Sequence, residues 1–175
     1  MAIMLEETYK WYVSQRRIAY NPVHTLQLIN KVVKWITENR KPGLLLYGTV
    51  GSGKTTMALS LRHLLIIFGQ RMDKVSALEL SRAAKGSEDD YHRYMKSEML
   101  LIDDMGEEPD VVKNFGNEIS PIIEIIYHRY DRQLLTIITS NLSDDEMRNR
   151  YGIRVSDRFK EMFDRIYFSL ESFRS

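Results

Sequence analysis

Residues 48–55 read Gly-Thr-Val-Gly-Ser-Gly-Lys-Thr and match the pattern G-x-x-x-x-G-K-[S/T] at every fixed position. A short apolar run at 44–47 precedes this stretch, and an apolar segment with helical spacing follows it at 54–68. Glycines allow backbone N–H groups to turn towards a bound anion, and the N-terminus of the following helix adds its dipole. An ordinary glycine-rich turn would need neither the strand nor the helix. The stretch therefore predicts a phosphate loop that binds a nucleoside triphosphate.

Two side chains of this loop have specific expected roles. Lys54 reaches the β- and γ-phosphates, and the Thr55 hydroxyl is a ligand of Mg²⁺. The predicted cofactors are therefore ATP and Mg²⁺. The expected nucleotide contacts come from the whole loop and the residue after it: Gly48, Thr49, Val50, Gly51, Ser52, Gly53, Lys54, Thr55 and Thr56.

A second apolar strand, expected at 99–102, ends in the carboxylates Asp103 and Asp104. A buried strand can place Asp103 beside the phosphate loop, where it holds Mg²⁺ through water. Asp104, one methylene shorter than the commoner glutamate, then occupies the position of the carboxylate that polarises the attacking water. The alternative is a strand that stops at a charged turn. The acidic residues that follow are predicted to form a solvated loop: Glu107, Glu108 and Asp110.

A third strand, expected at 134–139, ends in Thr139-Ser140-Asn141. A polar side chain at the tip of this strand can sense the γ-phosphate and position water, and the Asn141 amide suits that role. The tripeptide alone would indicate no more than a turn, but together with the other two motifs it favours hydrolysis. A small-molecule kinase, the other class of this size, would need an arginine-bearing lid, and the sequence shows no such insertion.

The composition excludes several classes of chemistry. The chain has 175 residues, of which 43% are hydrophobic and 28% charged, so one domain with a substantial core is expected. The absence of cysteine excludes disulfides, thiolate metal sites and cysteine nucleophiles. The net charge of +1 lacks the global excess of many nucleic-acid binders but permits local basic surface. The histidines share no metal-ligand spacing: His24, His63, His92 and His128.

No targeting or membrane-spanning segment is expected. The first residues carry charged side chains within an aromatic stretch, unlike a signal peptide. The longest apolar runs, such as 122–126, are too short to span a bilayer. We therefore expect a cytoplasmic protein with no membrane partner.

The pattern along the chain predicts an α/β fold in which strands and helices alternate. Strands are expected at 44–47, 72–76, 99–102, 134–139 and 166–169. Helices are expected at 3–19, 22–39, 54–68, 118–130 and 155–164, short helices are expected within 77–96, and another helix is expected after a capping box of Ser143 and Glu146. This alternation indicates a three-layer P-loop NTPase with a five-stranded parallel sheet. Residues 1–21 are predicted as an N-terminal helical extension and 22–175 as the core.

The sequence resembles an AAA+ ATPase and, more narrowly, the bacterial helicase loaders of the DnaC and DnaI type and the related IstB transposition helpers. The resemblance covers residues 22–175. Five motifs carry it in order: 43–55, LLIDDMG at 100–106, IITSNL at 137–142, YGIRVSDRF at 151–159 and IYFSLESFR at 166–174.

This resemblance implies further features of the site. Members lack the usual helical lid. Their arginine finger lies in the C-terminal helix, which matches Arg158 here, with Arg154 one turn earlier as the alternative. A finger acts on the nucleotide of a neighbouring subunit, so it implies a homo-oligomer; the other interpretation of either arginine is a surface ion pair. Arg174 matches a second phosphate-sensing arginine and is the last expected nucleotide contact.

The resemblance also implies partners. The family's core engages single-stranded DNA, and its loaders act on a replicative helicase, whereas transposition helpers act with a transposase. Candidate DNA contacts are basic and aromatic side chains that equally suit packing or protein docking: Tyr91, Arg93, Tyr94, Lys96, Lys10, Trp11, Tyr12, Arg16 and Arg17. Loaders usually carry an N-terminal domain that grips the helicase, and residues 1–42 are too few for one. A nucleotide-gated binding module with little hydrolysis is the alternative of another class.

Overall fold

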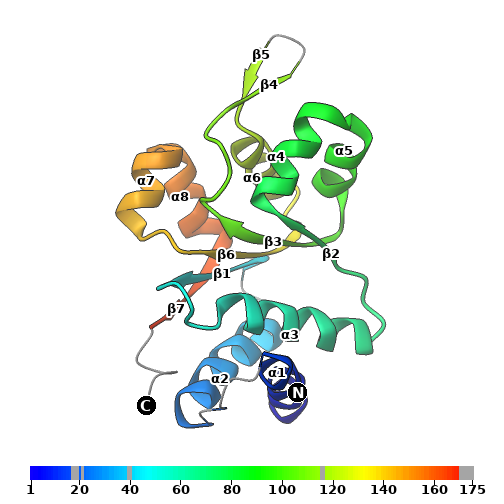
Figure 1. The fold of residues 1–175 in the computed structure, drawn as a ribbon, viewed down its shortest axis with the longest axis vertical. Helices are drawn as coiled ribbons and strands as arrows, with labels where there is room; N and C mark the ends of the chain where they lie inside the picture. Colours follow the sequence, from blue (N-terminus) through cyan, green and yellow to red (C-terminus); the bar gives the residue numbers. More distant parts are fainter. Residues whose placement is uncertain (17–19, 21, 39–40, 115–116, 170–175) are drawn as a thin grey trace.

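The central element of the fold is a five-stranded parallel sheet (Figure 1). The computed structural model describes residues 1–16, 20, 22–38, 41–114 and 117–169. The strands are β1 (Gly43–Gly48), β2 (Asp73–Ser76), β3 (Met99–Met105), β6 (Leu135–Ser140) and β7 (Phe163–Phe168). Their order is β2-β3-β6-β1-β7, and every pair in it is parallel. The predicted α/β fold and parallel sheet are confirmed.

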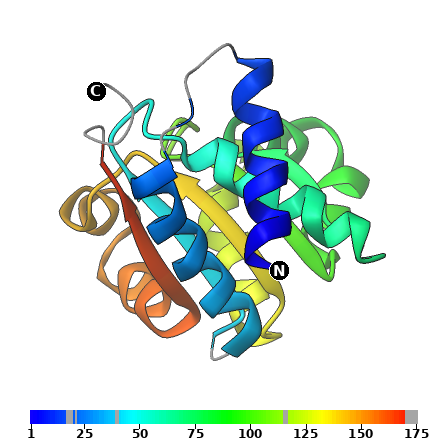
Figure 2. The same cartoon turned by 90° about the horizontal axis from the view of Figure 1, so that it is seen from below.

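Helices cover both faces of this sheet, as the three-layer prediction requires. One face carries α2 (Pro22–Glu38) and α3 (Lys54–Ile67), with α1 (Ala2–Gln15) outside α3 (Figures 1 and 2). The other face carries α4 (Ala77–Gly86), α5 (Glu88–Lys96), α6 (Pro121–Asp131), α7 (Asp144–Tyr151) and α8 (Ile153–Met162). Because side chains alternate along a strand, Leu44 and Leu46 join the first core and Leu45 joins the second.

The N-terminal helix α1 packs on the core rather than standing away from it. Leu5, Tyr9 and Val13 recur every four residues, so they share one face of the helix, and all three are buried within the cluster that contains Leu61 and Leu64 of α3. Figure 2 shows α1 crossing the outer side of α3. The predicted extension at 1–21 thus contains a helix that closes one side of the core.

Two local predictions are confirmed by the structure, and one short element was missed. A short antiparallel hairpin, β4 (Val112–Asn114) and β5 (Asn117–Ile119), was not predicted; it follows the predicted acidic loop, includes the first two residues of the helix predicted at 118–130, and projects at the top of Figure 1. The short helices predicted at 77–96 are confirmed as α4 and α5, which are separate because Ser87 ends α4 and its hydroxyl caps α5. The capping box of Ser143 and Glu146 is confirmed at the start of α7. Within the described residues, no helix has the length and apolarity that crossing a membrane requires.

Candidate functional site

The carboxyl ends of β1, β3 and β6 meet beside the N-terminus of α3, and this junction forms a cavity of about 260 Å³. Ligands of parallel α/β sheets commonly bind at such an edge. The cavity is lined by residues from the phosphate loop, the ends of β3 and β6, and α1: Tyr9, Val13, Arg16, Val50, Gly51, Gly53, Lys54, Thr55, Thr56, Asp104 and Asn141. The structure therefore brings most of the predicted catalytic residues to one place.

The phosphate loop depends on glycine at both of its ends. Gly48 has φ of 131°, and a Cβ there would lie 2.0 Å from the carbonyl oxygen of Phe168. The next residue, Thr49, donates its N–H to that same carbonyl at 3.1 Å, so β7 holds the start of the loop. Gly53 caps α3 in the left-handed region with φ of 92°. These backbone conformations turn the loop into the first turn of α3, where N–H groups are free to face an anion.

The ammonium of Lys54 lies inside the loop. Its Nζ donates to the carbonyl oxygens of Gly48 and Thr49 at 3.0 and 2.6 Å, and Ser52 Oγ lies at 3.4 Å. Burial lowers the pKa of Lys54, while Asp104 acts in the opposite direction. A buried cation whose hydrogen bonds go to neutral oxygens gains from an anionic partner. The loop therefore fits the triphosphate that its sequence predicts.

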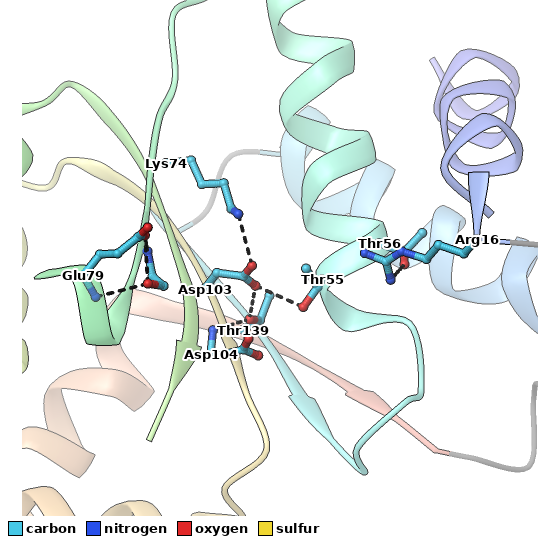
Figure 3. Close-up of polar contacts among 9 residues, drawn as sticks. Arg16, Thr55, Thr56, Lys74, Glu79, Asp103, Asp104 and Thr139 are labelled. Atoms are coloured by element: carbon cyan, nitrogen blue, oxygen red, sulfur yellow. Dashed lines mark hydrogen bonds and ion pairs between the residues drawn. The ribbon is translucent and has the colours of Figure 1, made fainter. Parts of the chain in front are cut away.

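Asp103, on β3, contacts the phosphate loop and the neighbouring strands β6 and β2 (Figure 3). Its Oδ1 accepts hydrogen bonds from Thr55 Oγ1 at 3.0 Å and from Thr139 Oγ1 at 2.7 Å. Its Oδ2 lies 3.5 Å from Nζ of Lys74 on β2. One carboxylate and one hydroxyl make a donor set that fits Mg²⁺, which commonly shares its remaining sites with water and substrate phosphates. Asp103 and Thr55 are thus the side chains that would hold the ion.

Lys74 is a member of this cluster that the sequence did not reveal. Its ammonium pairs with Asp103 and also lies close enough to help lower the pKa of Glu79, whose main cause is the hydrogen bonds to Ser76. Lysine on a short edge strand has no motif of its own, so only the pairing of β2 with β3 places it here. The lysine and Mg²⁺ would compete for the same carboxylate.

We expect Lys74→Met to lower the Mg²⁺ concentration needed for half-maximal binding of ATP, because the variant frees Asp103 from a competing cation. The expected shift is about 2- to 5-fold, as for the loss of one partly exposed ion pair. The measurement is a titration with Mg²⁺ at a fixed concentration of a fluorescent ATP analogue, whose emission reports the fraction of nucleotide bound. Lys85→Met, which removes an exposed lysine of α4, is the control. Two results would contradict the competition between Lys74 and Mg²⁺. One is an unchanged half-maximal Mg²⁺ concentration in Lys74→Met, and the other is an equal decrease in Lys85→Met.

Asp104 differs from its neighbour in backbone and environment. Its φ is 55°, and its N–H donates to Thr139 Oγ1 at 2.9 Å, where the register of β3 against β6 shifts. The side chain is half-buried in the cavity wall. Burial raises the pKa of Asp104, and Asp103 and Glu107 raise it further, whereas Lys54 and Lys74 oppose this. A raised pKa suits a carboxylate that accepts a proton from water.

The end of β6, the strand next to β3 in the sheet, places Asn141 on the wall of the same cavity as Asp104. Ser140 Oγ donates to the carbonyl oxygen of Met105 at 2.7 Å, and the N–H of Leu142 donates to Ser140 Oγ at 3.1 Å. These bonds tie the turn after β6 to the end of β3. The predicted proximity of Asn141 to the phosphate loop follows from this arrangement, and its role in sensing the γ-phosphate stays a prediction.

The solvated acidic loop was a wrong prediction for Glu108. This side chain is 4% exposed and accepts hydrogen bonds from the N–H of Gly106 at 2.8 Å and from the Tyr151 hydroxyl at 2.5 Å. Arg150 donates to its carbonyl oxygen. Arg150 and Tyr151 belong to α7, more than 40 residues away in sequence, so local polarity did not reveal these two donors. Only its neighbours Glu107 and Asp110 are exposed as predicted.

The candidate finger arginines lie on α8, and neither is among the described residues that line the cavity. The Arg158 guanidinium lies over the ring of Tyr127 at 3.9 Å and near that of Tyr130 at 5.3 Å. Arg154 is exposed. Arg174, the third predicted arginine, lies outside the described residues.

The candidate DNA contacts separate into buried and exposed residues. Tyr91 is 5% exposed and donates its hydroxyl to the carbonyl oxygen of Pro121, so for this residue packing replaces the predicted DNA contact. Arg93 and Lys96 remain at the surface, with Tyr94 half-buried. On α1, Trp11 is 51% exposed. Arg17 lies outside the described residues.

The strand order, the phosphate loop after β1 and the acidic turn after β3 define an ATP-binding P-loop domain of the AAA+ class. The chain belongs to the family of IstB-like ATP binding proteins, whose profile matches residues 14–170. The resemblance inferred from the motifs is thereby confirmed. No curated protein matches the chain in sequence.

Solved structures share the fold. The chain is similar to the DnaC helicase loader with a TM-score of 0.67 and 21% identity, over 87% of this chain and 94% of that one. It is similar to DnaI with a TM-score of 0.68 and 20% identity, over 88% and 89% of the two chains. AMPPCP-bound DnaA from Aquifex aeolicus gives a TM-score of 0.62 and 22% identity over 82% of this chain, which spans 46% of that DnaA chain. At these identities the likeness establishes the fold alone.

Proposed function

We propose that the protein is an ATPase that binds ATP with Mg²⁺ and hydrolyses the γ-phosphate. The observation that carries this proposal is the contact between the phosphate loop and the acidic strand. Thr55 Oγ1 donates to Asp103 Oδ1 at 3.0 Å, while Lys54 and Asp104 line the adjoining cavity. A site that only binds nucleotide has no use for a half-buried carboxylate with a raised pKa at this position.

In this proposal each side chain has one task. Lys54 contacts the β- and γ-phosphates, and Thr55 and Asp103 hold Mg²⁺, which neutralises charge on the phosphates when bound. Asp104 accepts a proton from the attacking water. Asn141 orients that water from the end of β6. Arg174 remains proposed as a second arginine that contacts phosphate.

We further propose that the active form is a homo-oligomer in which α8 of one subunit reaches the nucleotide of the next. Arg158 is the expected finger, although it stacks on Tyr127 in its own chain, and Arg154 is the exposed alternative. Neither arginine is among the described residues that line the cavity of its own chain, as expected for a side chain that acts on the nucleotide of a neighbouring subunit. An arginine supplied in this way is worth about 10³–10⁵ in rate in other P-loop enzymes.

For the biological role we propose a helicase-loader-like ATPase that assembles on single-stranded DNA in the cytoplasm, with a replicative helicase as partner. Support comes from the likeness in fold to the DnaC helicase loader over 94% of its chain. A replication initiator, DnaA, has been solved bound to AMPPCP and single-stranded DNA, with a TM-score of 0.61 and 17% identity over 90% of this chain and 49% of that one. The family match equally supports a transposition helper with a transposase partner.

The test is steady-state ATP hydrolysis over a range of protein concentrations, with and without single-stranded DNA. We expect turnover that rises with protein concentration and with DNA, and DNA affinity that falls with added salt. Arg158→Ala should lower turnover by about 10³-fold while ATP binding stays within about twofold. Mixing Arg158→Ala with Lys54→Ala, which lacks the phosphate contact but retains the finger, should restore part of the activity.

The control is Arg148→Ala, which removes an exposed arginine of α7. If Arg158→Ala is fully active and Arg154→Ala is inactive, the arginine finger is Arg154 and not Arg158. ATP binding without hydrolysis at any protein or DNA concentration would identify a nucleotide-gated binding module instead. Transfer of phosphate to an added small acceptor would identify a kinase.

A further inference from the structure

Helix α1 forms part of the wall of the nucleotide cavity. Tyr9, Val13 and Arg16 line the same cavity as Lys54 and Asp104. Tyr9 and Val13 are 1% and 5% exposed, so the helix is fixed by packing against α3 rather than lying loosely across the opening. The family profile begins at residue 14, so it includes Arg16 but not most of α1.

Arg16 reaches from this helix to the first turn of α3. Its guanidinium donates a hydrogen bond to Thr56 Oγ1 at 2.7 Å (Figure 3). None of the described carboxylates forms an ion pair with Arg16. A guanidinium has five donors, and the bond to Thr56 uses one of them. The arginine thus presents positive charge and spare donors at the cavity without an acidic partner among the described residues.

The position of Thr56 indicates which part of a nucleotide Arg16 would meet. The first hydrogen bond inside α3 runs from the N–H of Met57 to the carbonyl oxygen of Gly53 at 2.9 Å, so the N–H of Thr56 lies in the turn that faces an anion. The backbone of this turn cradles the α- and β-phosphates. Figure 3 shows Arg16 approaching from the side of α3 opposite Asp103, away from the carboxylates that would hold Mg²⁺.

We propose that Arg16 is a further nucleotide-binding residue, whose guanidinium contacts the phosphates shared by ATP and ADP while Thr56 holds it in place. This inference rests on the proposed nucleotide site. It assigns to α1 a share of nucleotide affinity that does not depend on the γ-phosphate. In this respect Arg16 differs from the finger arginine, which acts on hydrolysis and leaves binding in place.

The test compares the affinities for Mg·ATP and Mg·ADP of the wild-type protein and of Arg16→Gln, by calorimetric titration at two salt concentrations. Glutamine keeps some length and a hydrogen-bond donor but removes the charge. We expect Arg16→Gln to weaken both nucleotides by about 10-fold, as for loss of one charged hydrogen bond. The two losses should agree within about twofold, because the contact is to phosphates that both nucleotides have. The loss should shrink at high salt, and Arg16→Lys should recover part of the affinity.

The matched control is Lys10→Gln, which also removes one positive charge from α1 but whose ammonium is paired with Glu6 and Glu7. It should leave both affinities within about twofold of the wild type. The melting temperature without nucleotide should be the same for all variants, since the Arg16 side chain is exposed. If Arg16→Gln lowers it, Arg16→Lys provides the second comparison: this variant also lacks the guanidinium but keeps the charge, so it should bind both nucleotides more tightly than Arg16→Gln.

Three outcomes would overturn the inference. These are unchanged affinity in Arg16→Gln, an equal loss in Lys10→Gln, and a loss confined to ATP, which would place the arginine at the γ-phosphate. A wild-type protein that binds neither nucleotide would instead refute the proposed function. The two failures are therefore distinguishable in the same titration.

Discussion

Lys54→Ala is expected to lower the affinity for ATP on the order of 100-fold, the loss that removal of a buried charged contact to an anion produces. The ammonium lies inside the phosphate loop, 5% exposed, with hydrogen bonds to the carbonyl oxygens of Gly48 and Thr49. The methyl group of alanine is too short to reach the phosphates, and the carbonyl groups of Gly48 and Thr49 lose their donor. Both effects reduce binding and hence turnover.

The measurement is equilibrium titration with ATP in the presence of Mg²⁺, accompanied by thermal unfolding without nucleotide. Lys54 also stabilises the loop, because its ammonium donates hydrogen bonds to other residues of the loop. The unfolding experiment shows whether Lys54→Ala destabilises the fold or only lowers the affinity for ATP. Lys85→Ala removes an exposed lysine elsewhere and serves as the control. An ATP affinity of Lys54→Ala within threefold of the wild type would contradict the assignment of the site.

Arg129 is the largest fully buried side chain of the described residues, and all its hydrogen bonds go to neutral oxygens. It donates to Thr136 Oγ1 at 2.8 Å and to the carbonyl oxygens of Ser97 at 2.7 Å and Leu135 at 2.8 Å. Further bonds reach the end of α5 at Tyr94 and Met95. Burial lowers the pKa of Arg129 to about 10, although the charge of Asp73 opposes this. The side chain thus joins α6 to the last turn of α5 and to the start of β6.

We expect Arg129→Leu to lower the free energy of unfolding by about 3–5 kcal/mol, because several buried carbonyl groups lose their donor at once. The measurement is urea denaturation followed by circular dichroism. Arg129→Lys should recover only part of the loss, since an ammonium cannot reproduce the fork of the guanidinium. Arg132→Leu, one turn further along and exposed, is the control and should change stability by less than about 0.5 kcal/mol. A loss below about 1 kcal/mol in Arg129→Leu would contradict this account.

The order of the motifs was sufficient to predict the sheet and the centre of the site. In each motif the candidate functional residues lie at or directly after the end of a strand, so a short stretch of sequence is enough to recognise them. This holds for residues 48–55, for Asp103-Asp104 and for Asn141. Parallel strands end at one edge, and this rule alone brings the three segments together. The structure confirms their convergence.

The surroundings of the site could not be predicted because they depend on contacts between distant segments. Glu108 was expected in solvent, yet the donors of α7 bury it. Lys74 reaches Asp103 only through the pairing of β2 with β3, and Arg16 reaches Thr56 across 40 residues of sequence. The hairpin β4–β5 was also missed, because its short strands lie in a stretch that resembles a polar loop.

The sequence by itself determined the class of protein, the strands that carry the candidate site and the residues of its phosphate loop. Local spacing sets these features, since a phosphate loop needs its glycines, lysine and threonine in one continuous turn. Only the tertiary structure decided which other charges meet at that turn. Lys74 on β2 has no motif of its own, and the basic and aromatic stretch that contains Arg16, at the end of α1, indicated DNA or protein docking rather than nucleotide. A lysine or an arginine acquires a role only from the group that packing places beside it.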